Sequence, residues 1–69
     1  MIKLKVSELM GKNKFNIQKL SELTGLSRTT ISNLYHENVT RLDFETLEKL
    51  LEAFKCEVSE LIEYIPEAK

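Results

Sequence analysis

The 69-residue chain has little of what marks several common classes of protein. Its single cysteine, Cys56, excludes an internal disulfide bond and a zinc site made of several cysteines. No stretch approaches the roughly 20 apolar residues of a membrane span, and residues 1–5 lack the apolar core of a secretion signal. We therefore expect a single cytoplasmic domain over residues 1–69, with no membrane segment, no metal ion and no other cofactor.

Glycine and proline are also scarce, and Gly11, Gly25 and Pro66 are the only three. Apolar residues recur three and four positions apart, which is the spacing of helices, whereas no stretch alternates long enough to indicate a strand. The pattern predicts an all-α fold: a compact domain of five helices. We place these helices near residues 6–10, 17–24, 27–35, 44–54 and 58–62.

Several residues are suited to end or begin these helices. Asn16, Ser27 and Asp43 precede apolar-periodic stretches and are expected to cap the helices that follow. Gly25 is expected to end the second helix in a left-handed conformation, and Gly11 to help close the first. The expected inward faces are those of the third helix (Ile31, Leu34, Tyr35), the fourth (Phe44, Leu47, Leu50, Leu51, Phe54) and the fifth (Val58, Leu61, Ile62).

The charges are unevenly distributed along the chain. Residues 1–42 carry seven basic and three acidic side chains, a net charge of +4, whereas residues 43–69 carry three basic and eight acidic ones, a net charge of −5. A polyanionic partner is therefore plausible for the first part of the chain and unfavourable for the second.

The second and third predicted helices are joined by a very short connection. Two helices joined so closely must cross steeply, as in a helix-turn-helix unit. This geometry needs a small residue where the helices cross, a glycine at the turn and apolar residues after it. Ser21, Gly25, Leu26 and Ile31 meet these needs in order.

Three stretches of the chain together resemble one protein family. They are Leu20–Leu34 (LSELTGLSRTTISNL), Arg41–Phe54 (RLDFETLEKLLEAF) and Cys56–Pro66 (CEVSELIEYIP). The sequence resembles the compact Cro/CI-type (XRE-type, phage-repressor-like) helix-turn-helix transcriptional regulators. The resemblance implies a sequence-specific double-stranded DNA-binding regulator of the repressor type rather than an enzyme. Its helix-turn-helix unit would span about residues 16–36 and insert the helix at 27–36 into the major groove.

The polar face of that helix carries no acidic side chain. Short hydroxyl and amide groups beside one arginine suit the edges of bases in a groove. Following the resemblance, we expect base contacts from Arg28, Thr29, Ser32 and Asn33. We expect contacts to the DNA backbone from Lys14, Asn16, Ile17, Gln18, Ser27, Asn38, Thr40 and Arg41. The family usually has alanine where this chain has Ser21, and glutamine where it has Ile17.

A domain of this size would need a two-fold homodimer to read DNA with strong discrimination. The expected dimer contacts are Leu61, Tyr64 and Ile65, although these side chains could instead close the core. A second hypothesis is a protein-binding adaptor with the same fold, antitoxin-like or anti-repressor in kind. The acidic part of the chain favours this alternative slightly.

Overall fold

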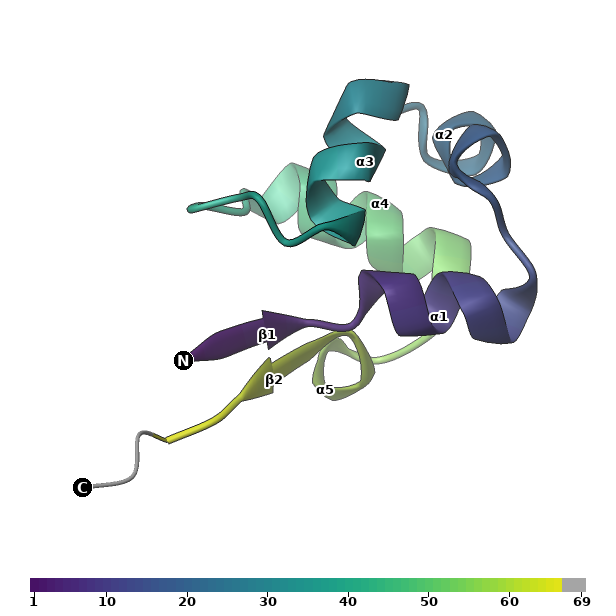
Figure 1. The fold of residues 1–69 in the computed structure, drawn as a ribbon. Coiled ribbons are helices and arrows are strands. Elements are labelled where there is room, and N and C mark those ends of the chain that lie inside the picture. The colour runs from purple at the N-terminus through teal and green to yellow at the C-terminus, as the bar shows by residue number, and fades with distance from the viewer. Residues whose placement is uncertain (67–69) are drawn as a thin grey trace.

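The computed structural model describes residues 1–66 and consists of five helices and a two-stranded sheet (Figure 1). The elements in chain order are β1 (Ile2–Leu4), α1 (Val6–Asn13), α2 (Ile17–Thr24), α3 (Arg28–Tyr35), α4 (Phe44–Phe54), α5 (Val58–Leu61) and β2 (Ile62–Tyr64). The prediction of a predominantly helical, compact domain is therefore confirmed.

The sheet was not expected from the sequence. β1 and β2 pair antiparallel, with Ile2 opposite Tyr64 and Leu4 opposite Ile62. Ile62, which we had placed in the last helix, has an extended backbone (φ −125°, ψ 134°), so α5 ends one residue earlier. Each strand has only three residues, too few to show an alternating pattern, and the pairing joins the two ends of the described chain. We call β1 and β2 together the ribbon.

Most helix ends lie where the sequence predicts them. The side chains of Asn16, Ser27 and Asp43 accept hydrogen bonds from the amides of the third helical residues of α2, α3 and α4. Such caps satisfy amides that have no partner inside a helix, and each contributes about 1 kcal/mol. Gly25 ends α2 with φ 77°, as expected. The exceptions are α1, which runs through Gly11 to Asn13, and α5, which ends before Ile62.

The core receives one completely buried apolar side chain from each helix: Val6, Leu20, Ile31, Leu50 and Leu61. Leu61 therefore packs inside the monomer, and the prediction that it contacts a second copy is wrong for this conformation. Its side chain has no exposed surface to offer.

The expected apolar face of α4 also needs correction at its start. Leu50 and Phe54 are buried, and Phe54 stacks on Phe15 with their ring centroids 5.9 Å apart. Phe44, in contrast, is 82% exposed. It is the first residue of the helix and lies beyond the edge of the core, although it shares the helical spacing of the buried residues.

Candidate nucleic-acid interface

The turn between α2 and α3 is fixed by hydrogen bonds from two hydroxyl groups. The hydroxyl of Ser21 donates to the carbonyl of Leu26 at 2.5 Å. The hydroxyl of Thr24 accepts from the amide of Leu26 at 3.1 Å and donates to the carbonyl of Leu20 at 2.8 Å. Both side chains therefore hold the residue that follows Gly25 against α2, and the direction in which α3 leaves the turn is well defined.

The two helices cross steeply. Figure 1 views α2 nearly along its axis and α3 from the side, which excludes a parallel-sided hairpin. Leu20 of α2 and Ile31 of α3 belong to the same buried cluster. Because those side chains face inward, the remaining face of α3 is free to project from the molecule.

The exposed face of α3 carries the side chains that we expected to read bases. Arg28, Thr29 and Asn33 are exposed, whereas Ser32 is half-buried. There is no acidic residue in α3 or at either of its caps. The hydroxyl of Ser27, an expected backbone contact, already accepts from the Thr30 amide at 3.1 Å and donates to the Thr30 hydroxyl at 2.9 Å.

Several of the expected contacts line one open hollow between the start of α2 and both ends of α3. Arg28 lies there together with Asn16, Ile17 and Gln18. The amides of Ile17 and Gln18 are the first two of α2, where helix geometry provides no internal acceptor. Such amides and the positive end of the helix dipole favour an anion. We call this feature the α2–α3 hollow, and its walls are Met10, Phe15, Asn16, Ile17, Gln18, Arg28, Tyr35 and His36.

Tyr35 is one of two polar residues of the α2–α3 hollow, with His36, that the sequence-based contacts did not include. The spacing of α3 placed it in the buried stripe with Ile31 and Leu34, but it is 41% exposed and lines the α2–α3 hollow. Its ring meets that of His36 edge-on, with the centroids 5.1 Å apart. A tyrosine one position after the buried Leu34 lies at the margin of the apolar stripe, and its hydroxyl was the available signal for exposure.

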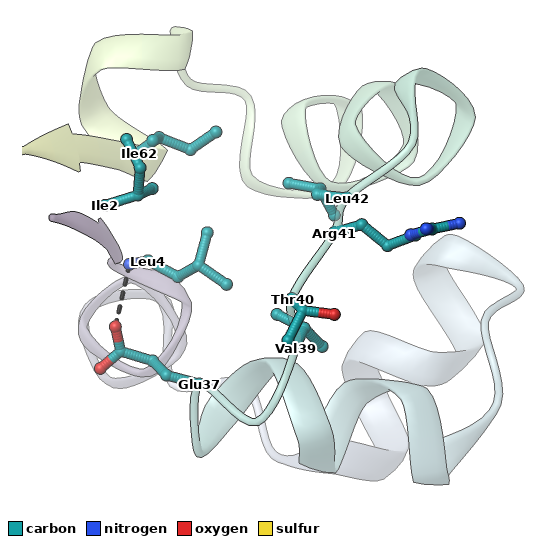
Figure 2. A pocket seen from close by; sticks show the side chains of 8 residues that line it. All are labelled: Ile2, Leu4, Glu37, Val39, Thr40, Arg41, Leu42 and Ile62. Carbon is teal, nitrogen blue, oxygen red and sulfur yellow. Dashed lines mark hydrogen bonds between the residues drawn. The ribbon is translucent and has the colours of Figure 1, made fainter.

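The remaining residues that we expected to contact the DNA backbone lie outside the α2–α3 hollow. Lys14 is exposed and takes a left-handed conformation (φ 58°) at the end of α1. Asn38, Thr40 and Arg41 lie in the connection from α3 to α4, and Thr40 and Arg41 line a different hollow. We call it the ribbon hollow, and its walls are Ile2, Leu4, Glu37, Val39, Thr40, Arg41, Leu42 and Ile62 (Figure 2).

Glu37 ties the end of α3 to the ribbon. Its backbone is left-handed (φ 58°), a conformation that residues with a Cβ rarely adopt. Its carboxylate accepts a hydrogen bond of 3.0 Å from the amide of Leu4, drawn as the dashed line in Figure 2. This bond satisfies an outward-facing amide of β1 and fixes the position of α3 relative to the strand.

The fold, the crossing of α2 and α3 and the acid-free exposed face agree with one family. The family model of the Cro/C1-type HTH DNA-binding domain matches residues 5–67. The chain belongs to this family. A comparison with curated protein sequences found no match. As a member of the Cro/C1-type family, the protein is a DNA-binding regulator of transcription, and its partner is double-stranded DNA.

Cys56 is the only cysteine of the chain and is half-buried. Burial raises the pKa of the Cys56 thiol, and the nearby charge of Glu60 raises it further, so that less of the reactive thiolate forms. Within residues 1–66, no group of three histidine, cysteine or acidic side chains is arranged to hold a metal ion. None of the helices in this range has both the length and the apolar content that a membrane span requires.

Proposed function

We propose that this protein is a sequence-specific repressor that inserts residues 27–36 into the major groove of DNA. In this proposal, residues 16–36 form the docking unit of a single domain that spans the chain, and the protein acts in the cytoplasm. The observation that carries the proposal is the exposed, acid-free face of α3, held at a fixed angle by the Ser21 and Thr24 hydrogen bonds.

The proposed roles follow from the chemistry of each side chain. Arg28 can donate two hydrogen bonds to a guanine, and Asn33 can pair in the same way with an adenine. Thr29 can pack its methyl group against thymine, while the half-buried Ser32 supports these contacts from the edge of the exposed face of α3.

Contacts to phosphates would fix the orientation of α3 in the groove. The α2–α3 hollow supplies the first amides of α2 with Asn16 and Gln18, and Tyr35 and His36 add donors from the other side. Flanking contacts are proposed for Lys14, Ser27, Asn38, Thr40 and Arg41.

The test is selection of binding sites from random duplex DNA, followed by affinity measurements on the selected site. Arg28→Ala and Asn33→Ala should each weaken binding by about 1–3 kcal/mol and relax the choice of base at one position. Lys14→Ala should weaken binding to all sequences alike. It should also reduce the slope of log affinity against log salt concentration by about one.

Lys49→Ala is the matched control, because it removes one positive charge from α4, outside the docking unit. It should leave the selected sequence and the affinity for it nearly unchanged. If no sequence is enriched, or if Arg28→Ala and Lys49→Ala have equal effects, base reading by α3 is refuted.

Strong discrimination by so small a domain would require two copies on half-sites about 34 Å apart, and we propose such a homodimer. Tyr64 and Ile65 are exposed and remain candidates for its contacts. The alternative is a protein-binding adaptor of the same fold, for which the acidic residues of α4 and α5 are the supporting feature. An adaptor would enrich no DNA site, and changes at Tyr64 or Ile65 would remove its protein partner.

A further inference from the structure

His36 is the only histidine of the chain, and it lines the α2–α3 hollow. It caps the C-terminal end of α3 and is exposed, so its ring nitrogens can meet a ligand from solution. Arg28 lies at the opposite end of α3, roughly 12 Å away along the helix axis, and lines the same hollow. The hollow therefore reaches from a side chain that is proposed to read a base to the histidine at the other end of the helix.

The position of the His36 ring is restricted by its neighbours. Its plane lies at 79° to that of Tyr35, with the centroids 5.1 Å apart, an edge-on contact that aromatic rings favour. The amide of His36 donates to the Ser32 carbonyl at 3.0 Å, which holds the backbone at the end of α3. In Figure 1, α3 runs from the turn after α2 towards α1, so this end of the helix lies on the side of α1. The imidazole is therefore held against Tyr35 at the wall of the hollow.

The charge of the α2–α3 hollow depends on His36. Among the residues that form its walls, all within residues 1–66, Arg28 carries a fixed positive charge, and Tyr35 and His36 are the other titratable side chains. None of these wall residues is acidic. Histidine is the side chain whose charge most often changes near physiological pH. Protonation of His36 therefore adds a second positive charge to a hollow whose walls carry no negative one.

The other charged side chains of the elements that meet α3 lie outside these walls. Glu37, the next residue in the chain, accepts a hydrogen bond of 3.0 Å from an amide of β1. The charged residues of α1, its C-cap and α2 are Glu8, Lys12, Lys14, Lys19 and Glu22, and none of them is a wall of the hollow. A protonated His36 therefore meets no carboxylate in the hollow, and an anionic group such as a phosphate of DNA complements it.

We propose that His36 binds a phosphate of the DNA backbone in its protonated form, so that the affinity for DNA rises as the pH falls from about 8 to about 6. This inference rests on the proposed function, because it assigns one phosphate contact to the same docking unit. The imidazolium donates a charge-assisted hydrogen bond to a phosphate oxygen. The phosphate in turn stabilises the imidazolium against the positive charge of Arg28 in the same hollow, so that proton and DNA bind together.

The expected size of the effect is that of one exposed charge pair. A charge-assisted hydrogen bond between exposed groups changes an affinity by about threefold to tenfold. One further neutralised phosphate also makes the slope of log affinity against log salt concentration steeper by about one at the lower pH. Up to about one proton should be taken up with the DNA, and calorimetry detects it as a heat of binding that depends on the buffer.

The affinity of the full chain for its selected DNA site, measured by fluorescence anisotropy at about pH 6 and about pH 8, tests the inference. The wild type should bind about threefold to tenfold more tightly at the lower pH. His36→Gln keeps a neutral donor, so its affinity should be the same at both pH values and equal to that of the wild type at the higher one. His36→Arg keeps a permanent charge, so its affinity should also be independent of pH but close to that of the wild type at the lower one. Circular dichroism at both pH values would verify that the variants are folded.

Lys49→Ala again serves as the matched control, because it removes a positive charge from α4, outside the α2–α3 hollow. It should keep the full pH dependence of the wild type. A wild-type affinity that is the same at both pH values would overturn the inference, as would a His36→Gln variant that binds more tightly at the lower pH by the same factor as the wild type.

Binding to a duplex of random sequence separates this inference from the proposed function, because a phosphate contact does not depend on the bases. If a site is selected and Arg28→Ala relaxes it, but binding does not respond to pH, the role of His36 is refuted and base reading stands. If no site is enriched, but the random duplex is bound more tightly at the lower pH and His36→Gln abolishes this response, base reading fails and the phosphate contact stands. If the protein binds neither duplex at either pH, both proposals are refuted.

Discussion

Glu37 offers a quantitative test of how the fold holds α3 against the ribbon. Its carboxylate bonds the Leu4 amide at 3.0 Å, while its own backbone is left-handed. Two opposing contributions therefore meet at one residue. A hydrogen bond to a charged acceptor in a partly buried site is worth about 1–2 kcal/mol, and a left-handed conformation costs about 1 kcal/mol for a residue with a Cβ.

Three substitutions separate these contributions. Glu37→Ala loses the hydrogen bond but keeps the unfavourable left-handed backbone, so the free energy of unfolding should fall by about 1–2 kcal/mol. Glu37→Gly loses the same bond but removes the backbone cost, so it should be about 1 kcal/mol more stable than Glu37→Ala. Glu37→Gln keeps a carbonyl acceptor, so its free energy of unfolding should fall by less than about 1 kcal/mol.

Urea unfolding followed by far-ultraviolet circular dichroism measures these differences. In a domain of this size, about 1 kcal/mol also moves the melting temperature by roughly 4–8 °C. Equal stabilities of Glu37→Ala and Glu37→Gly would refute the backbone argument. A Glu37→Ala variant as stable as the wild type would refute the contribution of the hydrogen bond to Leu4.

Two further predictions concern the α2–α3 turn and the start of α4. Ser21→Ala introduces the residue that the family usually has, and it should lower the free energy of unfolding in urea by about 1 kcal/mol because the Leu26 carbonyl loses its donor. An unchanged urea midpoint would mean that this hydrogen bond does not stabilise the fold. Hydrogen bonds from the side chain and then the amide of Thr46 lower the pKa of Asp43. Its contribution is therefore present above the usual aspartate pKa and lost as the pH falls through the lowered value. Asp43→Asn keeps the cap but should lose less stability between about pH 5 and pH 2 than the wild type does, and identical acid profiles would contradict this.

The helix ends that carry a side-chain cap or a glycine could be predicted from the sequence, because local chemistry decides them. Asn16, Ser27 and Asp43 each bond an amide three residues away, and Gly25 adopts a conformation that few other residues tolerate. The spacing of small and apolar residues around Gly25 likewise required a steep crossing of α2 and α3. The prediction of a helix-turn-helix unit followed from these short-range features, whereas the family was indicated by the resemblance of three stretches of the chain.

What the sequence missed depends on residues that are far apart along the chain. The ribbon pairs Ile2 with Tyr64, and no local pattern in three-residue strands indicates such a partner. Phe44 and Leu61 occupy similar positions in helical patterns, yet one is almost fully exposed and the other is buried. A helical pattern gives the direction of a side chain around its own helix, whereas burial also requires another element to lie opposite it. The tertiary structure alone therefore decided the ribbon, the contact of Glu37 with Leu4 and the apolar surface around Tyr64.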